Sequence, residues 1–303
     1  MNIFLDNLMK NNNVLLNLDN CPCCFGHLTR GKVLKKLYND IHLSLTRELL
    51  LEKKEFFPYE YITGDYDIYL NYLKNNKINI VIHDVKININ LYNACNQYSK
   101  YNKLKQYLIY TNSRNIDNIT SFDNIDCILL PYPEIMRQEF NFIKTKKPKI
   151  FIDGIYNYLN ITNDNIKLIK NKYNICNNKK NIVVTVSTGN WDFSEKIFQR
   201  IYDVYKNIDD YNLIFIYGIY YKGKIFKSNN LTSSIFENNM LSLFSLADIV
   251  ICQGSYNTIT ECINLNKNII CFPRHDRELN EASRYAKYYN KIKVVNILND
   301  TSK

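Results

Sequence analysis

The chain has 303 residues, of which 46% are hydrophobic and 14% aromatic, and its formal net charge is +10. This length is sufficient for two domains with separate cores, and the apolar content excludes wholesale disorder. The charge is compatible with nucleic acid, an anionic membrane surface or a phosphorylated substrate as partner. Because the lysines are scattered without a nucleic-acid-binding motif, nucleic acid is not expected.

The nine cysteines are odd in number, and most of them stand within apolar runs, as Cys127, Cys252 and Cys271 do. In such surroundings a thiol behaves as a small hydrophobic side chain. Residues 1–10 lack the pattern of a signal peptide, and no apolar run approaches the 18 residues of a membrane span. We therefore expect a reduced, cytoplasmic protein whose contact with a membrane, such as the inner membrane face, would be peripheral.

The first half of the chain alternates between short apolar runs and helical patterns. Asn2–Leu5 is compatible with a strand or a frayed leader, and Val14–Leu18 is the first clear buried strand. Leucine and valine then recur at helical spacing, so a helix is predicted to start near His27. Further strands are predicted over Ile78–His83, Gln106–Tyr110, Cys127–Leu130 and Lys149–Ile152, with a helix through Leu91–Tyr98. Such alternation predicts parallel βαβ units.

An Asn- and Lys-rich stretch of low hydrophobicity, residues 157–180, contains one possible helix and is the best candidate for a linker. It separates predicted domains over residues 1–156 and 181–303. The second domain repeats the α/β pattern. Its predicted strands are Asn181–Ser187, Asn212–Tyr217, Ser234–Phe236, Ile249–Cys252, Asn268–Phe272 and Lys293–Ile297, and its predicted helices are Glu195–Lys206, Met240–Ser245 and Glu278–Tyr289, with one more beginning near Asn257.

The most informative stretch is Ile249–Glu261, which predicts a buried strand, a tight turn at Gly254-Ser255 and the start of a helix. Such a turn directs backbone N–H groups and the positive end of the helix dipole at one point, where a diphosphate can bind. Glu261, one turn into the helix, is placed to accept hydrogen bonds from a ribose. The same pattern is also compatible with an ordinary packing element that carries a surface glutamate.

Four ordered segments resemble the C-terminal donor-binding domain of glycosyltransferase family 28, and they are Ile235–Met240, Leu246–Ile251, Gly254–Glu261 and Asn268–Arg274. That family includes the N-acetylglucosaminyltransferase that makes the peptidoglycan lipid precursor, and monogalactosyldiacylglycerol synthase. The resemblance covers about Asn181 to Ile297. A second, shorter segment, Phe25–Arg30, is similar to the Gly-His-containing first loop of these enzymes.

The resemblance implies an α/β fold of the GT-B type, with two Rossmann-like domains facing a cleft and a nucleotide sugar held by the second domain. On the donor side, the backbone around Phe236-Glu237 and the side chain of Met240 would border the base. Gly254, Ser255 and Thr258 would face the diphosphate, and Glu261 would bind the ribose. Ser187, Thr188 and Gly189 would add phosphate-side contacts. On the acceptor side, Gly26 would lie beside His27, a general base or else a helix-capping or packing residue, and Arg30 would hold His27 or an acceptor phosphate.

Several positions depart from the family pattern. Cys21, Cys23 and Cys24 precede His27 where glycine-rich sequence is usual, and adjacent cysteines that point apart do not favour a metal site. Arg274, Glu278 and Asn280 stand where the family has a carboxylate, glutamine and asparagine cluster for the donor sugar, although a solvated helix face would carry the same residues. The chain also stops soon after its last predicted strand, whereas GT-B enzymes generally continue into helices that return to the first domain.

The sequence therefore predicts a metal-independent glycosyltransferase without a cofactor. It would move a hexose or N-acetylhexosamine from a nucleotide diphosphate, preferentially UDP, to a hydroxyl acceptor. The basic charge and the family resemblance both favour a lipid-linked acceptor. Two alternatives stay open. One is a nucleotide-sugar 2-epimerase of the same fold, and the other is a non-catalytic nucleotide-sugar-binding subunit of a two-component transferase.

Overall fold

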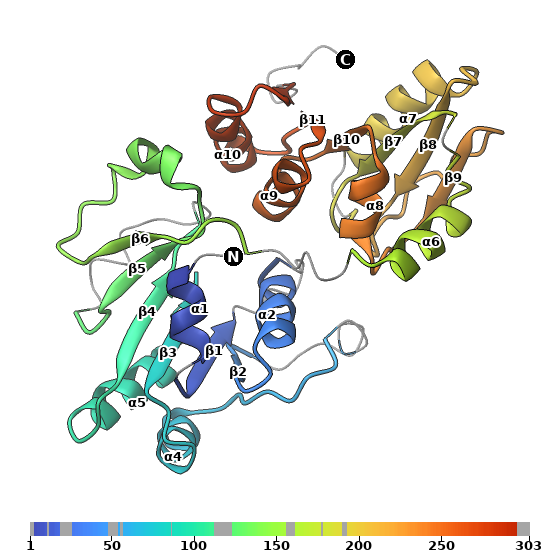
Figure 1. The fold of residues 1–303 in the computed structure, drawn as a ribbon. Helices are drawn as coiled ribbons and strands as arrows, with labels where there is room; N and C mark the ends of the chain where they lie inside the picture. Colours follow the sequence, from blue (N-terminus) through green and yellow to red (C-terminus); the bar gives the residue numbers. More distant parts are fainter. Residues whose placement is uncertain are drawn as a thin grey trace. The chain divides into compact units, whose positions relative to one another are not determined.

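The computed structural model describes residues 3–10, 12–18, 26–47, 54, 57–85, 87–111, 123–155, 161–176, 178–189 and 193–295. The chain divides into two compact units, Met1–Ile155 and Tyr156–Lys303. Each unit is built on its own parallel sheet (Figure 1).

The first unit contains a six-stranded sheet in the order β2-β1-β3-β4-β5-β6. Its strands are β1 (Val14–Leu18), β2 (His42–Leu45), β3 (Ile80–Asp84), β4 (Lys105–Ile109), β5 (Cys127–Leu130) and β6 (Lys149–Phe151). Neighbouring strands are parallel throughout, and Leu18 lies in register with both Leu45 and Asp84. The carboxyl ends of β1, β2 and β3 therefore meet at one edge of the sheet.

Helices cover both faces of this sheet because successive strand residues point to opposite sides. Leu16 packs with α1 (Ile3–Lys10) and α2 (Gly26–Leu37), whereas Leu15 packs with α4 (Tyr66–Asn75) and α5 (Ile89–Ser99). A 3-10 helix, η2 (Glu134–Phe140), precedes β6. With both faces buried, the strands read as continuous apolar runs, as parallel strands do.

The second unit contains a six-stranded parallel sheet in the order β12-β11-β10-β7-β8-β9. Its strands are β7 (Lys180–Thr185), β8 (Tyr211–Ile216), β9 (Leu231–Ser234), β10 (Ile249–Cys252), β11 (Asn268–Cys271) and β12 (Ile292–Val294). Its helices are α6 (Asn163–Lys172), α7 (Ser194–Tyr205), α8 (Met240–Leu246), α9 (Tyr256–Asn264) and α10 (Asp276–Ala286). Read from β9, this is the strand order of the Rossmann fold.

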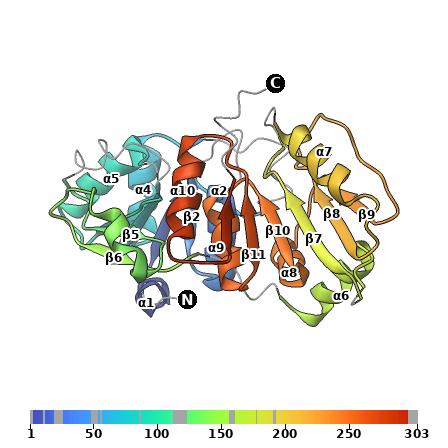
Figure 2. The same ribbon diagram turned by 90° about the horizontal axis from the view of Figure 1, so that it is seen from above.

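The core of the second unit also has two sides. Val184 and Phe215 pack with Phe198 of α7 on one face, while Val183 and Ile214 are buried on the other. On that second face α8 contacts β7 and α6, and α9 contacts β11. Figure 2 shows α7 on one side of β7 and β8, with α6 and α8 on the opposite side.

Each sheet reverses its direction of growth at one pair of neighbouring strands. In the first unit the pair is β1 and β3, and in the second it is β7 and β10. In each pair, the chain that follows one strand runs to one side of the sheet and the chain that follows the other strand runs to the opposite side. A crevice is left outside the carboxyl ends of the pair, and α/β sheets of this kind bind ligands there.

Most predicted elements are confirmed within about two residues, including β1, β5, β10 and the helix that begins at His27. The predicted strand Asn2–Leu5 is wrong, because Ile3–Lys10 forms a helix with Leu5 and Leu8 buried. The strand predicted at Ser234–Phe236 lies earlier, over Leu231–Ser234. The sequence did not predict β2 or α4. The end of the predicted strand Lys293–Ile297 lies in residues 296–303, which are outside the described residues.

Phe198 provides a test of the packing in the second unit. Its ring is fully buried and lies 4.9 Å from Phe215, 4.7 Å from Tyr217 and 5.6 Å from Tyr221, centroid to centroid. We expect Phe198→Ala to lower the free energy of unfolding of this unit by about 3–5 kcal/mol, because it leaves a cavity. The change can be followed in urea by the fluorescence of Trp191, the only tryptophan in the chain.

Val204→Ala is the matched control, because Val204 lies on the same helix with 61% of its surface exposed. It should shift the free energy of unfolding by no more than about 0.5 kcal/mol. Equal losses for the two variants would contradict this account of the core.

Candidate functional sites

In the first unit, a charged cluster lies at the carboxyl ends of β1 and β3. Helix α2 begins at Gly26, and it carries His27 and Arg30 one turn apart. Asp84 is the last residue of β3. Since β1 and β3 are the pair at which the sheet reverses direction, the cluster occupies the position where α/β sheets bind ligands.

Asp84 contacts both other members of this cluster, His27 and Arg30. Its carboxylate is fully buried, accepts from Arg30 Nε at 3.1 Å and lies 2.9 Å from His27 Nδ1, which is itself 2.8 Å from Arg30 Nη2. Arg30 Nη2 lies 3.0 Å from Asp84 Oδ1, so the guanidinium binds the carboxylate through two nitrogens. This two-point contact fixes the orientation of all three side chains.

The charges around Asp84 determine its ionisation. Burial by itself raises the pKa of Asp84, but the positive charges of Arg30 and His27 outweigh burial and hold that pKa below its ordinary value. The group is therefore a carboxylate at neutral pH. A proton on Nδ1 of His27 satisfies the Asp84 carboxylate and leaves Nε2 as the proton acceptor, whereas the Arg30 Nη2 donor 2.8 Å from the same Nδ1 favours the other tautomer.

Sequence reasoning predicted His27 and Arg30 but missed Asp84. The signal was present, because an aspartate ends the apolar run Ile80–His83, and the ends of neighbouring parallel strands meet. His83 belongs to the same strand and is fully buried. Burial lowers its pKa to about 4, so it is neutral, and its Nε2 pairs with Gln106 Oε1 at 3.2 Å.

In the second unit, two turns that were predicted to face phosphate lie side by side. Ser187, Thr188 and Gly189 follow β7, and Gly254 and Ser255 follow β10. Gln253 joins the turns by donating from Nε2 to the Val186 carbonyl at 2.7 Å. The structure thus brings these predicted residues together at the point where the second sheet reverses direction.

The first of these turns depends on its glycine. Gly189 has φ +78°, and a Cβ there would lie 2.3 Å from the Tyr217 carbonyl oxygen. The backbone of this turn therefore packs directly on the end of β8. Ser187 is exposed with φ +57°, whereas Thr188 is buried.

The second turn presents the start of α9. Gly254 has φ +89°, and Ser255 precedes the first helical residue without capping the helix by its own side chain. The Ser255 hydroxyl instead donates to Thr258 Oγ1 at 3.1 Å. The first backbone N–H groups of α9 are thus not satisfied by the Ser255 side chain, and the positive end of the helix dipole lies beside them.

Glu261 lies one turn further along α9 and is half-buried. Within the part of the chain that the structure describes, its carboxylate takes part in no hydrogen bond or ion pair. Burial raises the pKa of Glu261 to about 7. An unpaired acceptor of this kind can bind the hydroxyl groups of a sugar.

Phe236 and Met240 lie on the connection between β9 and α8, both half-buried. The Phe236 carbonyl accepts from Ser234 Oγ at 2.8 Å, and Met240 is the first residue of α8. Glu237 between them is buried and points to α6, where Lys172 Nζ donates to it at 2.7 Å. Sequence reasoning predicted the backbone at this point but missed the contact with α6.

The third predicted group of donor-binding residues, Arg274, Glu278 and Asn280, follows β11, and only its first two members contact each other. Arg274 Nε donates to Glu278 Oε1 at 2.9 Å, and the Arg274 backbone N–H donates to Glu278 Oε2 at 3.1 Å. Glu278 is buried and committed to Arg274. Asn280 is exposed on α10, and no contact joins it to that pair.

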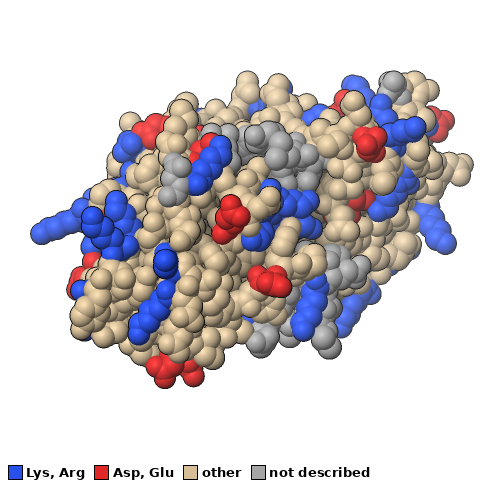
Figure 3. All heavy atoms as spheres, turned by 60° about the horizontal axis from the view of Figure 1, so that its bottom comes forward, with Lys and Arg blue, Asp and Glu red and all other residues tan. Residues whose placement is uncertain are grey.

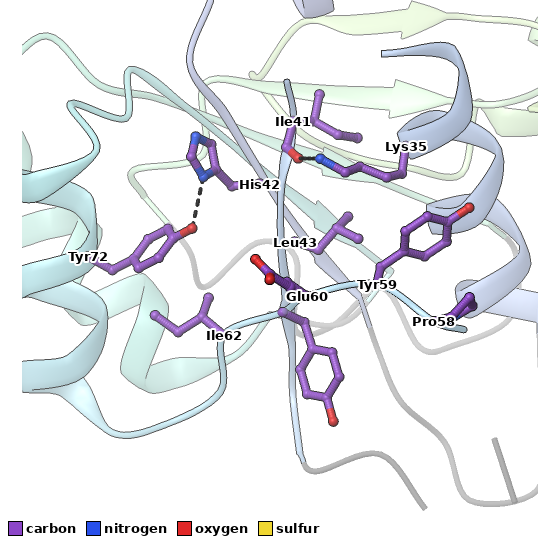
Figure 4. A pocket seen from close by; sticks show the side chains of 10 residues that line it. Lys35, Ile41, His42, Leu43, Pro58, Tyr59, Glu60, Ile62 and Tyr72 are labelled. Carbon is purple, nitrogen blue, oxygen red and sulfur yellow. Dashed lines mark hydrogen bonds between the residues drawn. The ribbon is translucent and has the colours of Figure 1, made fainter. Parts of the chain in front are cut away.

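A pocket of about 420 Å³ lies in the first unit, beside the amino-terminal end of β2 (Figure 4). It is lined by Lys35, Ile41, His42, Leu43, Pro58, Tyr59, Glu60, Tyr61, Ile62 and Tyr72. His42 lies in register with Leu15 near the start of β1, whereas Asp84 lies in register with Leu18. The pocket is thus at the other end of the strands, and no predicted site residue lines it.

The remaining predictions concern metals, charge and membranes. Cys21, Cys23 and Cys24 lie outside the described residues, and among the described ones no group of three His, Cys, Asp or Glu residues is suited to a metal ion. Cys127, Cys252 and Cys271 are buried and unbridged. On the face drawn in Figure 3, Lys and Arg side chains stand in separate groups with acidic side chains between them. No described helix is both long and apolar enough to cross a membrane.

Solved structures with the same architecture are enzymes of sugar transfer and sugar modification. A spinosyn forosaminyltransferase, SpnP, matches with a TM-score of 0.66 and 10% identity over 96% of this chain and 87% of its own. MurG of Acinetobacter baumannii matches with a TM-score of 0.55 and 14% identity, over 93% of this chain and 85% of its own. The UDP-GlcNAc 2-epimerase of Neisseria meningitidis matches with a TM-score of 0.57 and 12% identity, over 93% of this chain and 87% of its own. The GT-B fold expected from the sequence is confirmed.

The family comparison adds the chemistry. Residues 177–302 match the glycosyltransferase family 28 C-terminal domain, which covers nearly all of the second unit. The second unit thus carries a domain that matches the C-terminal domain of glycosyltransferase family 28. A search of curated proteins found no match in sequence.

The buried charges of the first unit generate a stability prediction. Arg30→Met leaves the Asp84 carboxylate buried without its guanidinium partner, and we expect the free energy of unfolding of this unit to fall by about 3–5 kcal/mol. Asp84→Asn should cost a similar amount. The double variant should lose less free energy of unfolding than the two single variants lose together, because neither charge is left buried without its partner. Hydrogen exchange of the β3 amides measures each loss.

Lys10→Met is the control, because it removes an exposed ion pair with Asp6 in the same unit. Exchange in β3 should not change in this variant. Strictly additive losses in the Arg30 and Asp84 variants would show that the two side chains do not act as a pair.

Proposed function

We propose that the chain transfers a hexose or N-acetylhexosamine from a nucleotide diphosphate, preferentially UDP, to a hydroxyl acceptor, without a metal ion. The observation that carries the proposal is the position of the predicted donor residues within the family 28 domain. They follow the carboxyl ends of β7, β9, β10 and β11, which lie at one edge of one sheet.

The width of this edge suits an extended donor. From β9 to β11 the order is β9, β8, β7, β10 and β11, and strands about 4.8 Å apart span about 19 Å over these four steps. Base, diphosphate and sugar can therefore lie in a row. Phe236 and Met240 would meet the base, and Glu261 the ribose. Arg274, paired with Glu278, would lie nearest the sugar.

The leaving group would be stabilised by the backbone rather than by a metal. A nucleoside diphosphate gains negative charge as the glycosidic bond breaks. The N–H groups and dipole at the start of α9 oppose that charge without having to reorganise. Thr258, whose oxygen accepts from the Ser255 hydroxyl, would add a hydroxyl donor at the same end of the helix, and Ser255 would face the diphosphate beside it.

The acceptor hydroxyl would be activated by His27. The proton would pass to Nε2 of the ring while Asp84, bound to Nδ1, stabilises the imidazolium that forms. Arg30 keeps Asp84 ionised and in place. We further propose that the acceptor is carried at a membrane surface, which the basic charge of the chain favours.

Glu261 provides the first test, by isothermal titration with UDP-glucose and UDP-N-acetylglucosamine. Glu261→Gln should weaken binding on the order of tenfold, because it removes a charged hydrogen-bond acceptor. In the unaltered protein, affinity should rise as the pH increases through about 7, because the carboxyl then loses its proton. The variant should lose this pH dependence.

Glu195→Gln is the matched control, because Glu195 lies in the first turn of α7 and is exposed. It should change neither the affinity nor its pH dependence. A Glu261 variant that behaves like this control would remove the ribose role from the proposal.

His27→Ala tests the chemical step separately. We expect kcat to fall by about 10²- to 10⁴-fold, the contribution of a positioned general base, while the dissociation constant of the donor stays within about twofold. His42→Ala is the control in the same unit and should leave kcat unchanged. If His27→Ala weakened donor binding and left kcat intact, the residue would not be the base.

Product analysis separates this proposal from the two alternatives. Incubation with the donor alone should leave the sugar unchanged, and transfer should require an acceptor. An epimerised sugar would instead show a 2-epimerase. Donor binding without turnover over a broad panel of acceptors would indicate a subunit that needs a partner.

A further inference from the structure

The connection from β9 to α8, residues 235–239, is anchored to α6 by one buried carboxylate. Glu237 is 4% exposed. Its Oε2 accepts from Lys172 Nζ at 2.7 Å and from the Tyr173 hydroxyl at 2.8 Å. Its Oε1 accepts from the Asn239 backbone N–H at 2.8 Å. Both carboxylate oxygens thus accept hydrogen bonds within the second unit.

Other contacts hold the same connection from the side of the sheet. The Gly218 N–H donates to the Ile235 carbonyl at 2.9 Å, and the Ser234 hydroxyl donates to the Phe236 carbonyl at 2.8 Å. The contacts from β8 and β9 fix the beginning of the connection. The contact with α6 fixes its middle, so the backbone at Phe236 and Glu237 has one conformation.

Tyr173 is well placed to carry this anchor. Its side chain is buried, and its carbonyl accepts from Thr232 Oγ1 of β9 at 3.2 Å. Lys172 Nζ lies 5.1 Å from the centre of the Tyr173 ring. Burial raises the pKa of Tyr173, and the neighbouring Glu237 raises it further, so the hydroxyl keeps its proton and remains a donor.

We propose that Lys172 of α6 and Tyr173, which directly follows this helix, are positioning residues of the nucleobase subsite, acting through Glu237. This inference rests on the proposed function, which places the base against the backbone at Phe236 and Glu237. A nucleobase is recognised by a pattern of donors and acceptors along its edge. A backbone held in one conformation offers one such pattern, so the anchor determines both affinity for the base and discrimination between bases.

The experiment measures the dissociation constants of UDP and ADP, which share the diphosphate and differ in the base. Tyr173→Phe keeps the buried ring and removes the hydroxyl. We expect it to raise the dissociation constant of UDP about tenfold, because a hydrogen bond to a buried charge is lost. The dissociation constant of ADP should change less, so the preference of the protein between the two falls. In turnover, KM for the donor should rise while kcat at saturating donor is unchanged.

Lys172→Met is the second variant, because 41% of the Lys172 side chain is exposed and its replacement leaves no buried cavity. Like Tyr173→Phe, it should reduce the preference of the protein for UDP over ADP. Tyr202→Phe and Lys167→Met are the controls. Tyr202 donates to the Lys227 carbonyl at 2.8 Å, away from the connection, and Lys167 is an exposed lysine of α6. Both controls should retain the unaltered preference.

The outcomes separate this inference from the proposed function. If the unaltered protein bound UDP, and the Tyr173 and Lys172 variants weakened UDP and ADP equally or not at all, the inference would be overturned and the proposed function would stand. If the unaltered protein bound neither UDP, ADP nor GDP, the proposed function would itself fail.

Discussion

The parallel pairing of β7 with β10 is the constraint on which the donor side of this protein depends. These two strands are neighbours in space but lie more than sixty residues apart in the chain, with Ile182 beside Ile249 and Thr185 beside Cys252. Their carboxyl ends are therefore forced together, and the turns that follow them meet. The Gln253 side chain then bonds to the Val186 carbonyl and holds both turns at one spacing. Without this pairing, residues 187–189 and 254–261 would have no reason to act on one ligand.

The sheet of the first unit also reverses direction at one pair of strands, but it uses polar groups differently there. There the strand ends bring together charges, and their interaction is strong because Asp84 is fully buried. Burying a carboxylate has a large desolvation cost, which is offset only when cations and hydrogen bonds satisfy it. Arg30 and His27 do so, and the result is a histidine with a defined orientation. Stability and the preparation of a general base depend on the same three side chains.

The sequence predicted the two-part α/β architecture because buried parallel strands are continuous apolar runs, and those of β1, β5 and β10 are unmistakable. It missed β2, whose four residues include His42 and Ser44, because a short strand with alternating polar residues gives a weak pattern. It also missed α4, because one of the two residues that this helix buries, Tyr69 and Leu73, is a tyrosine, and its exposed face carries the apolar Ile68. The helix α1 was mistaken for a strand because its apolar residues stand close to the chain start with few neighbours to set a period.

Site residues that belong to one local motif, such as Gly254 and Glu261, could be predicted because their chemistry is contained in one strand, turn and helix. Residues that act in pairs across the fold could not. Asp84 stands 57 positions from His27, and Glu237 stands 64 positions from Tyr173. Each member of these pairs is unremarkable in its own segment, since a carboxylate after a strand or a tyrosine at a helix end has many possible partners. Only the order of strands selects the partner. The sequence therefore showed which residues could act as acids, bases or hydrogen-bond partners. It could not show which of them lie next to each other, because that depends on the order of the strands in the sheet.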